Sequence, residues 1–384
     1  MKVALIRQRF TLYGGAERYV GRLAEELIRR GVEVHILARK WDSDEKGDFY
    51  FHRIESAGGP TFIRQPSFAR RVAQVVAREQ FDLVHSFDRT YSQDVYRAGD
   101  GCHIEFLERR ARMQGNFRRT IDRLNPRHRA FLYLEARMFS DPRLKLVLAN
   151  SQQGKQEIIR HYGVAEDRIR VVYNGLDQSR FYPGLRELHR DTVRKELNFE
   201  ADEPMILYVG SGYRRKGLGE LVRTLAGVDG FLVVVGRDDI WPFKREAAKM
   251  GVDKRIVWLG PQKNVERLYG AADVFVLPSW YEPFSNACLE AMAAGLPVVT
   301  TRETGAAEAI EDGVNGYAVD FPVWTDSLAE RISAAMKLDR EKIIDANQRI
   351  LVPFTWEENL KQTLQAYDDI LKQKGGLTTG PGMA

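Results

Sequence analysis

Short apolar runs alternate along the chain with longer stretches in which apolar residues recur at helical spacing. In the first half, an apolar run at 3–6 is followed by an amphipathic stretch at 19–28, which ends at Gly31. A second apolar run follows at once, at 32–38. This strand–helix–strand order is typical of a parallel sheet. Further strands are expected at 82–86, 145–150 and 168–173.

The same alternation restarts after a turn-rich stretch at 173–184. The strands expected beyond it are 205–209, 231–235, 256–259, 274–277 and 297–301. Several of them are apolar throughout, which favours strands that helices cover on both faces. We therefore predict an α/β protein with two doubly wound, Rossmann-like domains that face a central cleft.

The length of 384 residues also favours two domains, because single cores stop growing near roughly 250–300 residues. The first domain is expected at 1–175 and the second at 176–352. A helix at 353–374 is expected to cross back to the first domain. A glycine- and threonine-rich tail at 375–384 is expected to be flexible.

Composition narrows the class of protein. The apolar fraction of 44% and the charged fraction of 29% are ordinary for a soluble globular protein. The two cysteines, Cys102 and Cys288, give no disulfide framework, which favours a reducing compartment. No signal peptide is visible, and no apolar run approaches the roughly 18 residues that span a bilayer. A cytoplasmic location is therefore expected.

Two carboxylates in the second half stand in an unusual setting. Glu282 follows a buried strand, where open α/β sheets bind ligands, and the amides of residues 284–287 begin a helix suited to hydroxyl oxygens or an anion. Glu290 lies within that helix among apolar residues, where a carboxylate needs hydrogen-bond donors. A ribose diol would supply two donors. The alternative is that Glu290 pairs with an arginine or a backbone amide.

The segment from Glu282 to Glu290, with Pro-Phe after the first Glu, resembles the Glu-x7-Glu signature of the retaining group 1, or family four, glycosyltransferases. That family has the two-domain GT-B fold. The resemblance implies that Glu290 binds the nucleotide ribose and that Glu282 lies against the donor sugar, in a catalytic role. It also implies that Phe284, Ser285 and Asn286 hold the sugar hydroxyls.

Two glycine-containing loops fit a diphosphate. Arg215 and Lys216 follow a strand and a glycine-rich turn, so their charges are placed to neutralise phosphates. The family has a Lys-Gly motif with an upstream arginine, and Arg214 also stays open for that role. Gly14 and Gly15 resemble the family's Gly-Gly-x-x-Arg motif, whose backbone approaches a phosphate or a sugar. The alternatives are a solvated charged face and a plain turn.

Asp100 is the candidate for the acceptor side. The stretch Arg-Ala-Gly-Asp that it ends, with His103 three residues later, resembles the family branch that adds glucose to the heptose region of the lipopolysaccharide core. We hypothesise that Asp100 receives or orients the proton of the acceptor hydroxyl. The alternative is that it caps the helix that starts near His103.

The positive charge is concentrated in a helical insertion at 103–137. This segment has nine arginines and four acids, a surplus of five that equals the net charge of the whole chain, +5. Aromatic residues are interleaved with the arginines, as suits an anionic membrane or a phosphorylated glycolipid. The residues expected on this acceptor or membrane side are His103, Arg109, Arg110, Arg112, Arg118 and Arg119. The alternative is a solvated helix face; no motif supports binding of nucleic acid.

Taken together, these features predict transfer of a hexose, with glucose from UDP-glucose favoured, to an inner-core heptose of lipopolysaccharide, on the cytoplasmic face of the inner membrane. Cofactor and metal are not expected, because Arg and Lys replace a divalent ion at the diphosphate. Asp42-Ser43-Asp44 and Asp238-Asp239 mimic metal motifs but are expected to be loops. Open alternatives are a mannosyl- or N-acetylglucosaminyltransferase, an epimerase or phosphorylase on the same scaffold, and a non-catalytic binder of anionic lipid or nucleic acid.

Overall fold

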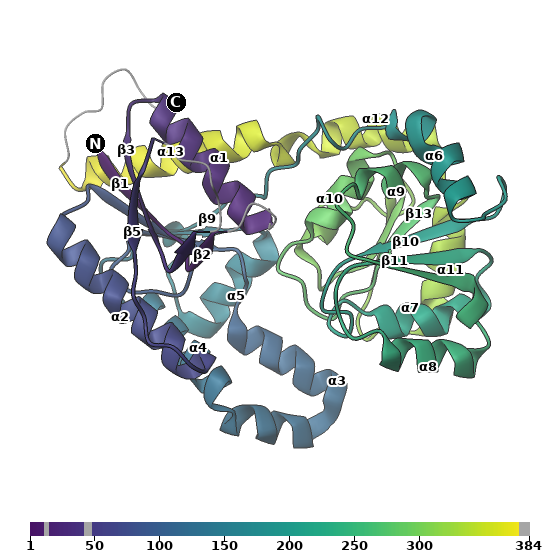
Figure 1. The fold of residues 1–384 in the computed structure, drawn as a ribbon, viewed down its shortest axis with the longest axis horizontal. Coiled ribbons are helices and arrows are strands. Elements are labelled where there is room, and N and C mark those ends of the chain that lie inside the picture. Colours follow the sequence, from purple (N-terminus) through teal and green to yellow (C-terminus); the bar gives the residue numbers. More distant parts are fainter. Residues whose placement is uncertain (11–14, 42–47, 376–384) are drawn as a thin grey trace. The chain divides into compact units, whose positions relative to one another are not determined.

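The computed structural model describes residues 1–10, 15–41 and 48–375. The chain divides into two compact units (Figure 1). The first unit comprises Met1–Tyr173 and the chain from Glu357 on, and the second unit comprises Asn174–Trp356. The last helix, α13 (Trp356–Gln373), therefore packs on the first unit. Its Tyr367 hydroxyl lies 2.6 Å from Nδ1 of the fully buried His85.

The first unit has a seven-stranded sheet in the order β5-β3-β1-β6-β7-β8-β9, and every pairing in it is parallel. The strands are β1 (Lys2–Ile6), β3 (Glu33–Ala38), β5 (Tyr50–Arg53), β6 (Leu83–Ser86), β7 (Val95–Ala98), β8 (Leu146–Ala149) and β9 (Ile169–Val171). The short strands β2 (Arg9–Phe10) and β4 (Lys40–Trp41) pair separately. The direction of strand order reverses between β1 and β6, so the loops after these two strands flank the crevice where such sheets bind ligands.

Helices cover both faces of this sheet. In Figure 1, α1 (Gly15–Arg29) and α13 lie above it, and α2 (Thr61–Glu79) and α4 (Pro126–Phe139) lie below it. The other two helices of the unit are α3 (His103–Leu124) and α5 (Gln152–Tyr162). The central strand β1 is completely buried from Val3 to Ile6, as its apolar run requires.

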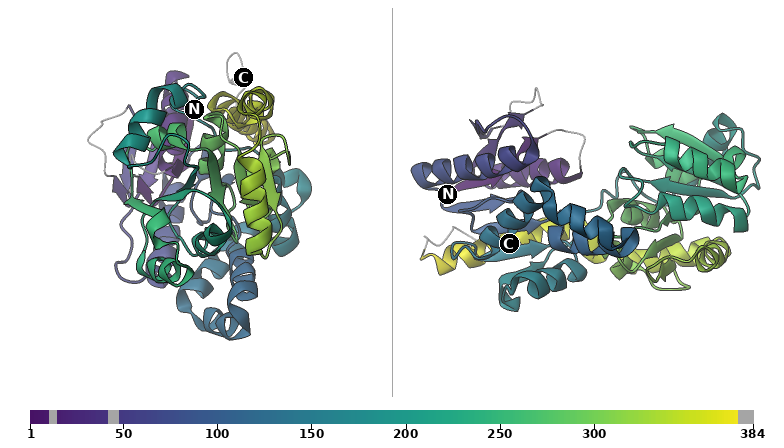
Figure 2. Two further views of the ribbon diagram at one scale, coloured as in Figure 1. Left: turned by 90° about the vertical axis from the view of Figure 1, so that its right-hand side faces the viewer. Right: turned by 90° about the horizontal axis from the view of Figure 1, so that it is seen from below.

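The second unit repeats the design with six parallel strands in the order β12-β11-β10-β13-β14-β15. The strands are β10 (Met205–Val209), β11 (Phe231–Val235), β12 (Ile256–Gly260), β13 (Val274–Leu277), β14 (Val298–Thr301) and β15 (Gly316–Val319). Its helices are α6 (Leu185–Glu196), α7 (Leu218–Thr224), α8 (Trp241–Met250), α9 (Glu266–Ala271), α10 (Asn286–Ala293), α11 (Thr325–Ala335) and α12 (Arg340–Ile350). They form layers on both sides of the sheet (Figure 2). The order reverses between β10 and β13.

The prediction of two doubly wound α/β domains is confirmed by these parallel sheets. Strands β5, β7 and β15 were not expected, because none is an uninterrupted apolar run. β7 carries the buried Arg97, whose Nη1 donates to Val172 O at 2.7 Å, and β15 begins at a glycine. Of the tail expected at 375–384, residues 376–384 lie outside the described residues.

The insertion expected at 103–137 is helical and consists of two helices, α3 and α4. Asn125 ends α3, and its side chain caps α4 by accepting from Arg127 N at 2.9 Å. Within α3, Gly115 has φ 81° and ψ 171°, which kinks the helix. Over the described ranges, no helix is both long and apolar enough to cross a membrane.

Candidate active site

The loops after β10 and β13 contact each other through their backbones at the switch point of the second unit. Trp280 N donates to Arg215 O at 2.9 Å. Gly217 has φ +72°, and a Cβ there would lie 1.9 Å from Pro278 O. Only glycine fits so close an approach of two backbones, so the Lys-Gly pair in the sequence has a steric reason.

This backbone contact places the side chains of Arg215 and Lys216 beside Glu282. Arg215 Nη1 donates to Glu282 Oε2 at 2.8 Å and to Tyr281 O at 2.7 Å, and Lys216 Nζ lies 3.1 Å from the same carboxylate oxygen. Gly210 leaves room for the lysine, because a Cβ there would lie 2.6 Å from Lys216 Cδ. The Glu282 side chain is only 11% exposed, which strengthens these charge interactions relative to a surface pair. Arg214 is exposed.

Glu290 is half-buried on α10. Its Oε2 accepts a hydrogen bond from the hydroxyl of Tyr269 at 2.9 Å. Tyr269 is completely buried, and burial followed by the charge of Glu290 raises its pKa well above the usual value, so the hydroxyl stays a donor. This partner is a tyrosine, which the sequence does not indicate, in addition to the alternatives of an arginine or a backbone amide.

The side chains of residues 284–286 already have structural partners. Phe284 is buried with its ring 6.0 Å from that of Phe354. Ser285 caps α10 by accepting from Cys288 N at 3.4 Å, and Asn286 Oδ1 accepts from Asn174 Nδ2 at 2.8 Å. Their backbone amides at the helix start are therefore the groups most suited to sugar hydroxyls.

The switch point of the first unit carries a carboxylate that is only 17% exposed and that the sequence patterns did not single out. Asp88, after β6, accepts from Gln8 N at 2.5 Å, and its Oδ1 lies 3.5 Å from Arg7 Nη1, after β1. Burial raises the pKa of Asp88, and the charge of Arg7 opposes this shift. Both residues lie just after strands that the sequence predicts, at 3–6 and 82–86, a position that could have marked them.

Asp100 follows β7 and is 55% exposed, with Oδ2 3.5 Å from Arg89 Nη1. It does not cap α3, so that alternative is wrong: the N-cap is Cys102, and the carboxylate of Glu135 accepts from His103 N at 2.9 and 3.0 Å. Glu135 is 1% exposed and also accepts from Arg89 Nε at 2.7 Å and from the Tyr162 hydroxyl.

Arg89 thus connects Glu135 with the loop after β7. Besides its bonds to Glu135 and Asp100, its Nη2 donates to Gly101 O at 3.0 Å. The guanidinium lies 5.3 Å from the ring centre of Phe131 on α4. Arg89 and Glu135 stand 46 positions apart in the sequence, and no sequence motif indicates that they pair.

His103 is engaged within the helix pair. Its Nε2 lies 3.0 Å from His128 Nδ1, and its ring centre lies 4.9 Å from that of Phe131. Burial, followed by the charge of Arg89, lowers the pKa of His103 to about 3, so the imidazole is neutral near pH 7.

The acids of the 103–137 segment are mostly buried beneath its arginines. Glu105, Asp122 and Glu135 are 1%, 3% and 1% exposed. Three of the arginines expected on the acceptor or membrane side pair with these acids instead. Arg109 Nε lies 2.6 Å from Glu105, and the Nε atoms of Arg110 and Arg118 lie 3.5 and 3.3 Å from Asp122. The exposed arginines are Arg112, Arg119, Arg123, Arg127, Arg129 and Arg137. The outer face is therefore more basic than the composition of the segment suggests.

Several predictions fall outside the described residues or away from the switch points. Gly14 and the Asp42-Ser43-Asp44 stretch lie outside them, and Gly15 is the first residue of α1. Asp238 accepts from Tyr213 N at 2.8 Å, which fits a loop anchor. In the described part of the chain, the metal-ligand atoms of Glu105, Glu108 and His161 lie within 4.8 Å of one another, but Glu105 is already paired with Arg109.

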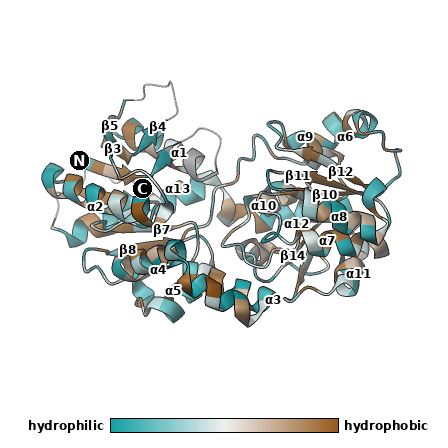
Figure 3. Ribbon diagram, turned by 60° about the horizontal axis from the view of Figure 1, so that its bottom comes forward, coloured by the Kyte–Doolittle hydropathy of each residue, from teal (hydrophilic) through white to brown (hydrophobic). Residues whose placement is uncertain are grey.

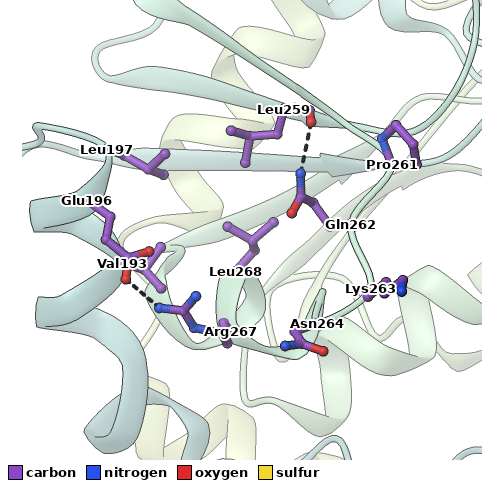
Figure 4. Close-up of a pocket in the computed structure, with 10 residues that line it drawn as sticks. All are labelled: Val193, Glu196, Leu197, Leu259, Pro261, Gln262, Lys263, Asn264, Arg267 and Leu268. Atoms are coloured by element: carbon purple, nitrogen blue, oxygen red, sulfur yellow. Dashed lines mark hydrogen bonds and ion pairs between the residues drawn. The ribbon is translucent and has the colours of Figure 1, made fainter.

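A hollow of about 390 Å³ lies between α6 and the loop after β12 (Figure 4). Arg267 pairs there with Glu196 at 2.7 Å, and Gln262 Nε2 donates to Leu259 O at 2.8 Å. None of the residues predicted for the site lines this hollow.

Comparison with known proteins assigns both halves of the chain. Residues 13–180 match the family Glycosyltransferase Family 4, and residues 189–350 match Glycosyl transferases group 1. A probable transglycosylase of Burkholderia thailandensis is 31% identical over 301 residues, which cover 77% of this chain and 76% of the relative. The lipopolysaccharide glucosyltransferase WaaG of Escherichia coli K12 is 25% identical over 342 residues, 88% of this chain and 90% of that one.

Solved structures share the fold. A crystal structure of WaaG, a glycosyltransferase of lipopolysaccharide biosynthesis, superposes with a TM-score of 0.79 at 24% identity and covers 96% of this chain and 99% of its own. A structure of HepE from Anabaena in complex with UDP-glucose gives a TM-score of 0.69 at 18% identity, over 97% and 100% of the two chains. With both halves matched and two parallel sheets present, this chain belongs to the group 1, or family 4, glycosyltransferases, which are retaining enzymes, and has the GT-B fold.

Proposed function

We propose that this enzyme transfers glucose from UDP-glucose to an inner-core heptose of lipopolysaccharide. The observation that carries the donor half is the cluster of Arg215, Lys216 and Glu282 at the switch point of the second unit. The E. coli relative named above is a lipopolysaccharide glucosyltransferase, and the Anabaena structure contains UDP-glucose. Both support the choice of sugar.

The donor would be bound through its three parts. Arg215 and Lys216 neutralise the diphosphate, and Glu290 accepts from the ribose hydroxyls while Tyr269 holds its carboxylate in place. Glu282 and the backbone amides of residues 284–286 hold the sugar. When the bond between the anomeric carbon and the phosphate oxygen breaks, negative charge grows on the diphosphate. The two cations stabilise that charge without a divalent ion.

On the acceptor side, Asp100 receives or orients the proton of the attacking hydroxyl. Its carboxylate is half exposed, so an acceptor can reach it, while Arg89 limits its movement. Asp100→Asn is expected to lower kcat by about 10²-fold, the size of a general-base contribution, with the KM for the donor unchanged. Full turnover by this variant would remove Asp100 from the mechanism.

The decisive experiment is incubation of the full-length chain with UDP-glucose, UDP-N-acetylglucosamine and GDP-mannose, each with truncated core oligosaccharides. Glucose transfer to a heptose-terminated acceptor, with the anomeric configuration retained, is the expected result. Transfer from GDP-mannose or UDP-N-acetylglucosamine alone would replace the proposed donor. Interconversion of nucleotide sugars without an acceptor would favour an epimerase. A second assay with EDTA tests the proposal that no metal takes part.

We also propose that the 103–137 segment places the enzyme on the anionic cytoplasmic face of the inner membrane. Exposed apolar side chains accompany the exposed arginines there: Phe117, Leu124 and Tyr133 are 81%, 72% and 54% exposed. Figure 3 shows hydrophobic and hydrophilic residues interspersed along α3. Such a mixture suits the boundary between phosphate headgroups and acyl chains.

Vesicle sedimentation tests this contact. The chain is expected to bind vesicles that contain phosphatidylglycerol and to leave pure phosphatidylcholine vesicles unbound. Replacement of Arg112, Arg119 and Arg123 by glutamate should abolish binding, since each basic residue contributes about 1 kcal/mol. If charge reversal leaves binding intact, the segment is only a solvated face.

A further inference from the structure

Glu282 holds its negative charge against the two cations that are proposed to bind the diphosphate. One oxygen, Oε2, is 2.8 Å from Arg215 Nη1 and 3.1 Å from Lys216 Nζ. Any diphosphate on this pair must share the cations with the carboxylate. Because the Glu282 side chain is only 11% exposed, water screens this competition poorly.

The backbone keeps Glu282 in this position. Glu282 N donates to Glu303 O at 3.1 Å, and Gly305 N donates to Glu282 O at 2.9 Å. Both peptide groups are therefore tied to the loop after β14. A bound ligand can turn the side chain, but it cannot carry the residue away from the cations without breaking these bonds.

The ion pair is not needed to hold the loops after β10 and β13 together. The bond from Trp280 N to Arg215 O and the close approach of Gly217 to Pro278 O already join them. A carboxylate with only a structural purpose would be redundant here. What the carboxylate does change is the net charge of the pair, from two positive charges to one.

We propose that Glu282 sets the preference of this site for the nucleotide sugar over the nucleoside diphosphate product. This inference rests on the proposed function, in which Arg215 and Lys216 bind the diphosphate. The donor's sugar hydroxyls offer hydrogen bonds to the carboxylate, which offset its repulsion of the phosphates. The product lacks the sugar and carries roughly one more negative charge, because a terminal phosphate has a second ionisation near pH 6. Glu282 thereby weakens product binding and speeds product release.

Titration calorimetry of the full-length chain at pH 7.5 tests this preference, with UDP and UDP-glucose as probes. For Glu282→Gln, the Kd of UDP is expected to fall about tenfold, which corresponds to about 1.4 kcal/mol. The Kd of UDP-glucose should fall less or rise, so the ratio of the two constants increases. Glu282→Ala should shift the UDP constant in the same direction. Glu311→Gln is the matched control, because Glu311 pairs with Arg349 at the surface of the same unit, and it should leave both constants unchanged.

The Arg215→Ala and Lys216→Ala variants separate the inference from the function on which it rests. If neither variant weakens UDP binding, the proposed diphosphate site itself is wrong. If both weaken it while Glu282→Gln binds UDP no more tightly than the wild type, only the inference is overturned. Thermal melts of each variant, run beside the titrations, show that the proteins compared are folded. Repeating the UDP titration with inorganic pyrophosphate removes any dependence on the base.

Discussion

The two switch points of this protein are built from charged residues in different ways. At the second unit's switch point, Arg215 and Lys216 meet Glu282 between two adjacent loops, and the lining residues come from compact sequence segments. At the first unit's, Arg89, in the loop after β6, is paired with Glu135 on α4, far away in the sequence. The proposed donor side is therefore built from local motifs, whereas the proposed acceptor side depends on tertiary pairing. A site built from local motifs can be predicted from the sequence, and one that depends on long-range pairing cannot.

Removing a donor-side cation should have the largest effect. Lys216→Ala is expected to lower kcat by about 10²–10³-fold, since it removes a preorganised charge that stabilises the leaving diphosphate. Steady-state kinetics with the identified donor measures this. Arg214→Ala is the matched control, because Arg214 is exposed beside the pair, and it should retain most of the activity. Equal losses in the two variants would mean that the loop acts only through its overall charge.

Removing the buried acid Glu135 from the first unit should cost stability rather than donor binding. Glu135→Ala leaves Arg89 without its closest carboxylate and strips the cap from α3, so the free energy of unfolding should fall by about 3–5 kcal/mol. Urea denaturation measures it. Glu166→Ala, which breaks an exposed pair with Lys155, should change stability by less than about 1 kcal/mol. A small loss for Glu135→Ala would show that the network is not needed for folding.

A more modest loss is expected at the ribose end of the donor site. Tyr269→Phe removes the hydroxyl that donates to Glu290, at a cost of about 1.5 kcal/mol for a bond to a charged group, and should weaken UDP binding several-fold. Tyr208→Phe provides the stability control. Within the described residues, the buried Tyr208 hydroxyl has no hydrogen-bond partner, so its loss should be nearly neutral. If Tyr269→Phe binds UDP as the wild type does, Tyr269 does not position Glu290.

The smallest effect should be a difference in pH response between the units. Six of the seven histidines belong to the first unit. Burial lowers the pKa of His85 well below its usual value and that of His103 to about 3. The unfolded chain therefore binds more protons than the folded one below about pH 6.5, and stability is lost as the pH falls through that value.

Hydrogen exchange measures this difference peptide by peptide. Protection of α3 and α4 should be lower at pH 5 than at pH 7, after correction for intrinsic exchange rates, and His103→Gln should reduce the change. Peptides from β10 and β13 in the second unit serve as the internal control. An equal drop in both units would locate the pH response elsewhere.

Sequence patterns sufficed for most of the fold because apolar runs and helical spacing report burial directly. They failed at β7, where the buried Arg97 interrupts the run, and at β15, which starts with a glycine. In the site, Arg215, Lys216, Glu282 and Glu290 stood out because their segments resemble family motifs. Tyr269 did not, since a tyrosine next to a leucine in a short helix looks like any other core residue until its hydroxyl is placed.

The sequence by itself determined the enzyme family and the two α/β domains, and it singled out the residues proposed for the donor side, because each depends on short-range spacing. Only the tertiary structure decided what those residues contact. It showed that Glu282 lies against both cations, that Tyr269 donates to Glu290, and that Glu135 rather than Asp100 caps α3. The physical reason is that a buried charge must be paired, and its partner is chosen by which strand ends and helices the fold brings together.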